Sequence, residues 1–259
     1  MGKIHIIHSK EELEPHHIEG KVAIVYDVLF ATSSITAAFH HGALSVYPAL
    51  TASEAIRMAE GSQEPYLLAG EEQGYTIPGF QSPTPIYLSS SVKNKRLFYK
   101  TTNGTVAIRR ASQAKYVYVA SLLNEQAILD YLVSHHVNDS ISLICAGSTK
   151  RFAIEDYYGA ASMIHRLLQH GEWTLTDRAL AAYYFYHGSP SAETVLRTST
   201  VGKWLVDYGL ASDVEFVANK NSCPVVPIYR THTGRIEEVG KDESSRANRE
   251  RWTIPYESD

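Results

Sequence analysis

Polar side chains that could bind a phosphate or a metal follow an apolar run near the start of the sequence. The run Val22–Tyr26 ends at Asp27, and Thr32, Ser33 and Ser34 follow a short turn later. Because ligands of open α/β sheets bind beyond the carboxyl ends of strands, Asp27 stands where metal or proton chemistry would take place. The free N–H groups of a helix that starts here would suit a phosphate, and the three hydroxyls would add donors. The alternative, that Ser33 only caps a helix and Asp27 only closes a turn, stays open at this point.

The segment Thr101–Thr105 has the same arrangement, an apolar run that ends in polar residues before a helical pattern. Its Asn103-Gly104 pair supplies the left-handed backbone geometry of a tight turn, and the threonines supply hydroxyls. In isolation a simple turn is the better interpretation. Asn103 becomes a candidate site residue only if the fold brings this turn beside Asp27.

A third apolar run ends at Gly147 and leads through the basic residues Lys150 and Arg151 to the paired carboxylates of Glu155 and Asp156. Carboxylates beside cations are what a hydrated Mg²⁺ next to a phosphate would use. The alternative is that acidic residues in a first helical turn only interact favourably with the helix dipole.

Two further segments have weaker patterns. Glu71 stands in Gly70–Phe80, where a strand end leads into a long irregular loop, and long loops in compact domains tend to be functional. Arg197 and Lys203 stand in Leu196–Lys203, with hydroxyl residues around a turn. For this last segment a solvated junction between helices is the better interpretation in isolation.

The bulk composition limits the classes of function. The chain has 259 residues, of which 44% are apolar and 20% charged, and its formal net charge is -4. The proportions of apolar and charged residues are those of a globular protein. The net negative charge argues against an overall positive potential that would bind nucleic acid or an anionic membrane. Cys145 and Cys223 lie outside any C-x-x-C pattern, which argues against a zinc site or a disulfide scaffold. The P-loop string and the Asp-x-Asp nucleophile motif are absent as well.

The start of the sequence lacks the apolar segment of a secretory signal peptide, and no apolar run reaches membrane-spanning length. We therefore expect a cytoplasmic protein whose partners include neither membrane nor nucleic acid. Because there is no global basic field, an anionic substrate would need a local cluster of donors.

Short apolar runs rich in Val, Ile and Tyr alternate with helical patterns, which is typical of β/α layering. The runs are continuous, so we expect an α/β protein with a largely parallel or mixed sheet and helices on both faces. The predicted strands are Lys3–Ile7, Val22–Tyr26, Ser45–Pro48, Tyr66–Leu68, Leu97–Lys100, Tyr116–Val119, Ser140–Cys145, Val225–Tyr229 and Arg235–Val239. The predicted helices are Ser34–His41, Ser53–Glu60, Thr105–Ala111, Asn124–His135 and Glu155–His170. After Gly171 the pattern again predicts helices, with Asp177, Ser189-Pro190 and Ser199 as N-cap signals. Residues 1–240 are predicted to form one α/β unit and residues 241–259 a polar tail, while a division into two lobes near residues 122–135 and a homodimer stay open.

In this order, the segments resemble the 2-phosphosulfolactate phosphatase family from about Ile4 to Tyr229. The resemblance rests on the strings Asp27-Val28-Leu29, Ala31–Ile35, Gly42-Ala43, Gly70-Glu71, Ile77–Phe80, Thr101–Thr105, Cys145–Gly147 and Glu155-Asp156. Any one of them is weak, whereas the ordered set is specific. The resemblance implies a layered α/β fold of the family's own type. It also implies a Mg²⁺-dependent phosphatase that converts 2-phospho-3-sulfolactate to sulfolactate and phosphate.

The resemblance implies roles for the site residues as well. The metal-binding set would be Asp27, Glu71, Glu155 and Asp156. The catalytic set would be Asp27, Asn103, Glu155 and Asp156. The substrate-binding set, which would face a small anionic phosphate ester, would be Thr32, Ser33, Ser34, Arg197 and Lys203. Whether Asp27 acts as a ligand, a base or a nucleophile stays open.

The chain departs from the family pattern at four places. Phe30 stands where close members have arginine, Gln81 where they have aspartate, and Lys150 where they have glycine. Ser82–Ile86, which includes Thr84, replaces their Gly-Asn-Ser-Pro. Loss of a cation, a carboxylate and an amide changes what a site recognises. The alternative function is therefore a non-catalytic or re-specialised homologue that binds an anionic metabolite or a protein partner.

Overall fold

The computed structural model describes residues 2–240 of the chain. Within these residues the strands form one 11-stranded sheet in the order β5-β4-β6-β3-β11-β10-β7-β2-β8-β1-β9. The strands are β1 (Lys3–Ile7), β2 (Val22–Tyr26), β3 (Ser45–Ala49), β4 (Tyr66–Glu72), β5 (Tyr75–Thr76), β6 (Arg96–Lys100), β7 (Tyr116–Ala120), β8 (Ile141–Cys145), β9 (Thr174–Leu175), β10 (Pro227–Arg230) and β11 (Arg235–Glu238). The α-helices are α1 (Pro15–Ile18), α2 (Ala31–His40), α3 (Ala52–Glu60), α4 (Pro85–Ser91), α5 (Gly104–Arg110), α6 (Glu125–His135), α7 (Ile154–His170), α8 (Asp177–Gly188), α9 (Ala192–Thr198), α10 (Thr200–Asp207) and α11 (Ala211–Ala218). The 3₁₀ turns are η1 (Lys10–Glu12), η2 (Ala111–Gln113) and η3 (Leu122–Asn124).

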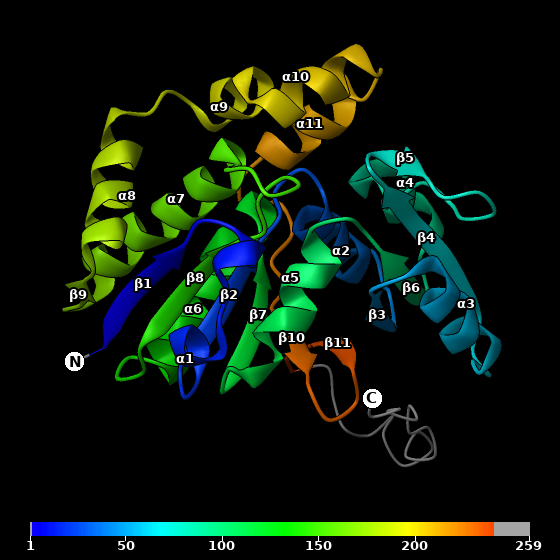
Figure 1. Cartoon of the computed structure of the whole chain (residues 1–259), viewed down its shortest axis with the longest axis horizontal. Helices are drawn as coiled ribbons and strands as arrows, with labels where there is room; N and C mark the ends of the chain where they lie inside the picture. The colour runs from blue at the N-terminus through cyan, green and yellow to red at the C-terminus, as the bar shows by residue number, and fades with distance from the viewer. Residues whose placement is uncertain (1, 241–259) are drawn as a thin grey trace.

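The sheet consists of two parallel blocks, an antiparallel hairpin between them and the edge strand β5, which pairs antiparallel with β4. β4, β6 and β3 run parallel to one another, and so do β7, β2, β8, β1 and β9. The antiparallel hairpin of β10 and β11 joins the blocks, because β10 pairs with β7 and β11 pairs with β3. Figure 1 shows this hairpin in orange at the lower centre of the molecule. The predicted α/β fold with a mixed, largely parallel sheet is confirmed.

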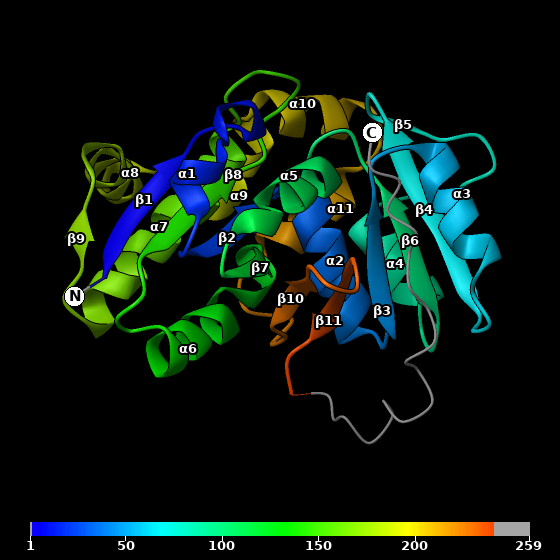
Figure 2. The same cartoon turned by 60° about the horizontal axis from the view of Figure 1, so that its bottom comes forward.

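The burial of β2 explains why the central strands are continuous apolar runs. All five of its residues are buried. Val22, Ile24 and Tyr26 pack into a core with residues of α6 and α7, whereas Ala23 and Val25 pack into a core with residues of α2 and α5. Successive side chains of a strand point to opposite faces, so helices on both sides require apolar residues throughout. Figure 2 shows α5 and α6 on opposite sides of β7.

Helix α3 begins and packs as an ordinary amphipathic segment. The side-chain oxygen of Thr51 accepts a 3.1 Å hydrogen bond from the Glu54 N–H and so caps the helix. The buried residues Ala55, Met58 and Ala59 follow the helical repeat, and the helix packs on β3, β4 and β6. Each predicted strand and helix has an observed counterpart whose ends differ by a few residues. The short elements α1, α4, β5 and β9 are not predicted.

Helices α9, α10 and α11 pack against one another and lie together at the top of Figure 1. α9 contacts α7, and α11 contacts α4. Ser199 is the N-cap of α10, since its hydroxyl oxygen accepts a 2.9 Å hydrogen bond from the Gly202 N–H. This group of helices supplies one wall of the cavity described below.

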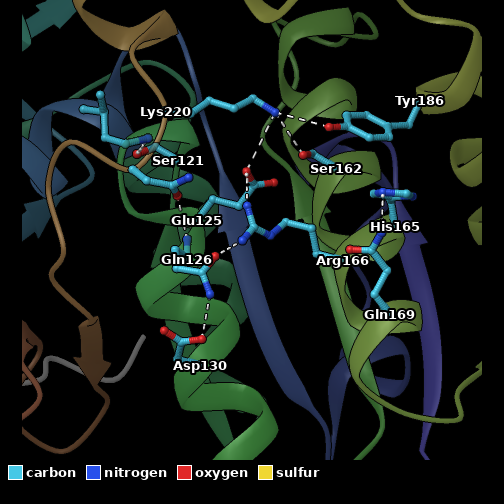
Figure 3. Close-up of polar contacts among 12 residues, drawn as sticks. Ser121, Glu125, Gln126, Asp130, Ser162, His165, Arg166, Gln169, Tyr186 and Lys220 are labelled. Atoms are coloured by element: carbon cyan, nitrogen blue, oxygen red, sulfur yellow. Dashed lines mark hydrogen bonds and ion pairs between the residues drawn. The ribbon is translucent and has the colours of Figure 1, made fainter.

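A buried ionic cluster ties α6, α7 and α8 to the chain that follows α11 (Figure 3). Glu125, 1% exposed, lies 3.4 Å from a guanidinium nitrogen of Arg166 and 3.8 Å from the ammonium of Lys220. The same ammonium donates to the Ser162 hydroxyl at 3.1 Å and to the Tyr186 hydroxyl at 3.4 Å. A buried carboxylate requires charged or donor partners of this kind, and here they come from α7 and from the chain that follows α11.

Residues 122–135 form η3 and α6, and strands from both sides of this segment pair in the sheet. The division into two lobes stays a prediction, as does the homodimer. The predicted polar tail, residues 241–259, lies outside the described residues. Within residues 2–240, no helix combines the length and the apolar character that a membrane crossing requires.

Candidate active site

The ends of several strands meet at one cavity of about 630 Å³. Asp27 follows β2, Glu71 lies at the end of β4, Asn103 follows β6, and Glu155 and Asp156 begin α7 after β8. All five residues line the cavity. The fold therefore brings together the predicted catalytic and metal-binding residues, which are spread over more than half of the sequence.

Asp27 is buried, with 8% of its surface exposed, in the turn between β2 and α2. Its carboxylate accepts a hydrogen bond from the Ala31 N–H, and its backbone carbonyl accepts one from the Thr32 N–H at 2.9 Å. Burial, followed by repulsion from the Glu71 carboxylate, raises the pKa of Asp27 to about 7. A carboxyl group with a pKa near neutrality can exchange a proton at physiological pH.

Gly104 allows the two polar turns to lie against each other. A Cβ added at Gly104 would lie 2.6 Å from Oδ2 of Asp27 and 2.4 Å from Cβ of Ala31, closer than any side chain could approach. Glycine is therefore required for the contact between the turn after β2 and the turn after β6. The left-handed geometry predicted for the Asn103-Gly104 pair is wrong, since Asn103 has a φ of -119° and Gly104 begins α5 without a positive φ. The close approach to Asp27 and Ala31 is what requires glycine here.

The carboxamide of Asn103 has a defined orientation. Its Oδ1 accepts a 2.7 Å hydrogen bond from Nζ of Lys10 and a 3.1 Å hydrogen bond from the Thr149 N–H. With Oδ1 engaged twice, the Nδ2 group is the end of the amide that can serve a ligand. Lys10 is 6% exposed and opens η1 after β1, and sequence reasoning does not identify it. The signal that could have found it is its position just beyond the end of an apolar strand.

Asp156 holds two strand ends together. One of its oxygens accepts a 2.8 Å hydrogen bond from the Val28 N–H and the other a 3.0 Å hydrogen bond from the Gly147 N–H. Burial, with repulsion from Asp27 and Glu155, raises the pKa of the Asp156 carboxyl. Burial also raises the pKa of Glu155, which is 3% exposed.

Glu71 links the β4–β5 turn to the turn after β6. Its Oε1 accepts from the Thr102 N–H, while its Oε2 accepts from the Thr102 hydroxyl at 2.8 Å and from the Gly74 N–H at 2.7 Å. Both carboxylate oxygens are thus used to position the backbone of the cavity wall. This role requires an acceptor at both oxygens and explains why the chain has a carboxylate here.

The carboxylates fit a hard divalent cation in charge and in donor chemistry, since Mg²⁺ prefers oxygen ligands. Within residues 2–240, no three His, Cys, Asp or Glu side chains are grouped closely enough to bind a metal by themselves. Mg²⁺ commonly uses only one or two carboxylates together with water and substrate phosphate. Asp27 and Glu155 have the carboxylates least engaged by backbone donors, and repulsion between them contributes to the raised pKa of Asp27. These two residues fit such a site best.

The residues predicted to contact the anion do not line the cavity. The hydroxyls of Thr32, Ser33 and Ser34 donate instead to the backbone carbonyls of Asp27, Val28 and Pro83. Hydroxyls in a first helical turn readily donate to nearby backbone carbonyls, and all three hydroxyls do so here. Arg197 forms ion pairs with Glu193 and Glu215, and Lys203 is exposed on α10.

The positions at which the chain departs from the family pattern lie in different places. Phe30 and Thr84 line the cavity. The side chain of Gln81 accepts a hydrogen bond from the Tyr87 hydroxyl and lies outside the lining. Lys150 has a φ of 64°, in the left-handed region that favours glycine, which accounts for glycine at this position in the family pattern.

One wall of the cavity is apolar and comes largely from α10. Its lining residues are Val201, Trp204, Leu205, Tyr208 and Leu210, and Phe30 lies at the start of α2. Sequence reasoning does not identify this wall, because apolar residues at helical spacing are usually core residues. The wall closes against the β4–β5 turn, since a Cβ added at Gly74 would lie 2.7 Å from the indole of Trp204.

Comparison with known proteins identifies the family. The family model described as 2-phosphosulpholactate phosphatase matches residues 7–232. A probable 2-phosphosulfolactate phosphatase of Clostridium perfringens is 34% identical over 242 residues, which cover 92% of this chain and 96% of the relative. Proteins of the same name from Clostridium acetobutylicum and Carboxydothermus hydrogenoformans are each 31% identical, over 88% and 90% of this chain and 97% and 96% of their own. The chain therefore belongs to the 2-phosphosulfolactate phosphatase family.

Proposed function

We propose that this protein is a Mg²⁺-dependent phosphatase that releases phosphate from a small phosphate monoester. The observation that carries the proposal is the convergence of Asp27, Glu155 and Asn103 on one cavity at the strand ends. The names of the relatives support hydrolysis of a phosphate ester as the reaction and 2-phosphosulfolactate as the family's reference substrate.

Asp27 and Glu155 would hold the metal, because Glu71 and Asp156 use their oxygens to bind the backbone. Bound Mg²⁺ would supply positive charge that neutralises the phosphoryl oxygens. The protein adds a neutral donor, the Nδ2 of Asn103, whose orientation Lys10 maintains. A preorganised donor of this kind stabilises charge that develops on the phosphoryl group.

Asp27 acts as the base in this proposal. Water attacks phosphorus, the bond between phosphorus and the ester oxygen breaks, and the Asp27 carboxylate accepts the proton of the attacking water. The departing alkoxide then takes up a proton from solvent water, and Asp27 releases its own proton to solvent, which restores the carboxylate. Asp27 would bind the metal through one carboxylate oxygen and accept the proton through the other. Burial raises the pKa of Asp27 to about 7 in the metal-free protein, and a bound cation would lower it, so the carboxylate that accepts the proton is ionised. Asp156 contributes indirectly, since it holds the N–H groups of Val28 and Gly147 at the cavity edge.

A phosphate-release screen over small phosphate monoesters, with and without Mg²⁺, tests the proposal. We expect release only with Mg²⁺, and a loss of roughly 100-fold or more in kcat for Asp27→Asn. Asp207→Asn, a change of an exposed residue at the end of α10, is the matched control and should retain full activity. Absence of release from every ester, or full activity in Asp27→Asn, would contradict the proposal. Calorimetric titration with the same esters tests the alternative of a non-catalytic homologue, which would bind them without releasing phosphate.

A further inference from the structure

The cavity that holds the catalytic carboxylates lacks cationic side chains. Its lining within residues 2–240 includes the carboxylates of Asp27, Glu71, Glu155 and Asp156 but no lysine, arginine or histidine. A phosphoryl group can be neutralised there by a divalent cation and by the Nδ2 of Asn103. A second anionic group on the same substrate would find no cation to pair with, and an unpaired charge in a desolvated site is strongly unfavourable.

The two buried lysines of residues 2–240, Lys10 and Lys100, are already engaged, while Lys150 and Arg151 are exposed and lie outside the lining. Nζ of Lys10 donates to Asn103 at 2.7 Å and pairs with Glu11 at 2.7 Å. Nζ of Lys100 donates to the Glu71 carbonyl and to the Glu72 carboxylate, each at 3.1 Å. Neither residue lines the cavity, so neither supplies a free charge for a sulfonate or a carboxylate of a substrate.

Part of the cavity wall is aromatic. A site that recognises an additional anionic group would instead have cationic side chains in its wall. The rings of Trp204 and Tyr208 are stacked, with centroids 5.2 Å apart and an interplanar angle of 15°. Both residues line the cavity together with Phe30, Val201 and Leu205. Aromatic faces attract apolar and aromatic groups through burial and ring contacts. A volume of about 630 Å³ also leaves room for a ligand body much larger than a phosphoryl group.

We infer that the substrate is a phosphate monoester of an uncharged, largely apolar alcohol or phenol, whose body lies against Trp204 and Phe30. The inference rests on the proposed function, because the carboxylate side of the cavity is assigned to the phosphoryl group. It differs from the family's reference substrate, which carries a sulfonate and a carboxylate in addition to the phosphate. Trp204, Phe30 and Tyr208 are then the residues that determine specificity.

Non-hydrolysable phosphonates test recognition without turnover. Calorimetric titration in Mg²⁺ would compare phenylphosphonate with 4-carboxyphenylphosphonate, which adds one anion, and with methylphosphonate, which lacks the aromatic body. We expect phenylphosphonate to bind roughly tenfold more tightly than either of the others. Equal or tighter binding of the carboxylated probe, equal binding of methylphosphonate, or no binding of any probe would overturn the inference.

Variants assign the effect to the aromatic wall. Trp204→Ala should reduce phenylphosphonate affinity to the level of methylphosphonate, whereas Tyr184→Ala, at a residue of α8 that is 65% exposed and outside the lining, should change nothing. Phe30→Arg places a cation in the lining, whereas Trp204→Ala leaves a void. The arginine variant should therefore bind the carboxylated probe more tightly than wild type does. It therefore keeps the inference testable if Trp204→Ala fails to fold.

Turnover separates this inference from the proposed function. The assay would use phenyl phosphate and 4-carboxyphenyl phosphate, the esters that correspond to the first two phosphonates. If the protein selects phenylphosphonate but releases phosphate from neither ester, the proposed phosphatase activity is wrong, while the inference that the cavity binds an apolar body still holds. If phosphate is released and kcat/KM for 4-carboxyphenyl phosphate equals or exceeds that for phenyl phosphate, the proposed phosphatase activity holds and the inference about apolar substrates is wrong.

Discussion

Nζ of Lys10 donates a 2.7 Å hydrogen bond to Oδ1 of Asn103, a residue 93 positions away in the sequence. The bond joins η1, which follows β1, to the turn after β6, and it leaves Nδ2 as the end of the Asn103 amide that can bind a ligand. Lys10 also interacts electrostatically with Asp27 and lowers its pKa, opposing the larger effect of burial. A single buried lysine thus influences both the donor and the base of the proposed reaction.

We predict that Lys10→Met lowers kcat by roughly 10- to 100-fold, because the amide of Asn103 loses its fixed orientation. Loss of the cation should also raise the pKa of Asp27, so the acidic limb of the pH–rate profile should move to higher pH. Lys115→Met removes an ion pair with Asp139 at the surface and is the control. A lower rate with an unshifted acidic limb would show that Lys10 has only a structural role.

Glu155 and Asp156 are adjacent in the sequence but are expected to respond differently to the same change. Asp156 accepts from two backbone N–H groups, so Asp156→Asn places an amide NH₂ against one of them and should destabilise the protein by about 1–3 kcal/mol. Glu155→Gln should leave the free energy of unfolding nearly unchanged or raise it, since burial disfavours the ionised carboxylate.

Urea denaturation and Mg²⁺ titration of the two variants check this difference. Glu155→Gln should weaken Mg²⁺ binding and lower kcat, whereas the main effect of Asp156→Asn should appear in the unfolding midpoint. If both variants lost stability equally, it would be incorrect to assign metal binding to Glu155 and backbone binding to Asp156.

Asp27→Asn should make the metal-free protein more stable at pH 8. The folded carboxyl has a pKa of about 7, well above its value in the unfolded chain, so the folded state binds the proton more strongly. The wild-type contribution to stability is therefore largest below the unfolded pKa and is lost as the pH rises through 7. We expect Asp27→Asn to exceed wild type by about 2 kcal/mol at pH 8, with a smaller difference at pH 5.

Urea denaturation at the two pH values, without metal, measures this difference. Asp207→Asn serves as the exposed control and should show no dependence of the difference on pH. Added Mg²⁺ should stabilise wild type but not Asp27→Asn, because a ligand that binds only the folded state raises its stability. A difference that grows toward pH 5 would have the wrong sign for a raised pKa.

The ionic cluster around Glu125 makes a separate prediction about stability. Glu125→Ala leaves Arg166 and Lys220 without their shared carboxylate in a largely buried position. Removal of one partner from a buried ion pair costs about 3–5 kcal/mol, because the remaining charge is uncompensated. Glu60→Ala, at an exposed position at the end of α3, should change the free energy of unfolding by less than about 0.5 kcal/mol. Thermal or urea unfolding that ranks the two variants equally would contradict the prediction.

The fold could be predicted from the sequence where burial imposes a pattern along the chain. Val22–Tyr26 is apolar throughout because helices cover both faces of β2, and that pattern also places Asp27 at a strand end. The side-chain partners could not be predicted in the same way. A hydroxyl such as that of Ser33 can donate a hydrogen bond to a ligand or to a backbone carbonyl. Which acceptor it uses depends on the geometry of the turn, and here it is the Val28 carbonyl. Lys10 meets Asn103 only after the strands have assembled, so no local pattern indicates the contact.

Phe30→Arg tests how one position controls specificity. An arginine can bind a sulfonate or a carboxylate through a bidentate, charge-assisted pair, whereas phenylalanine offers no donor and adds apolar surface to the lining. We expect the wild type to hydrolyse 2-phosphosulfolactate poorly and Phe30→Arg to raise kcat/KM for it roughly tenfold or more. Phe30→Leu, which keeps the position apolar, is the control and should show no gain. The gain in Phe30→Arg is limited by Gln81 and Thr84, which still differ from the family pattern. Efficient wild-type turnover of 2-phosphosulfolactate, not improved by the arginine, would show that recognition of the sulfonate does not depend on this position.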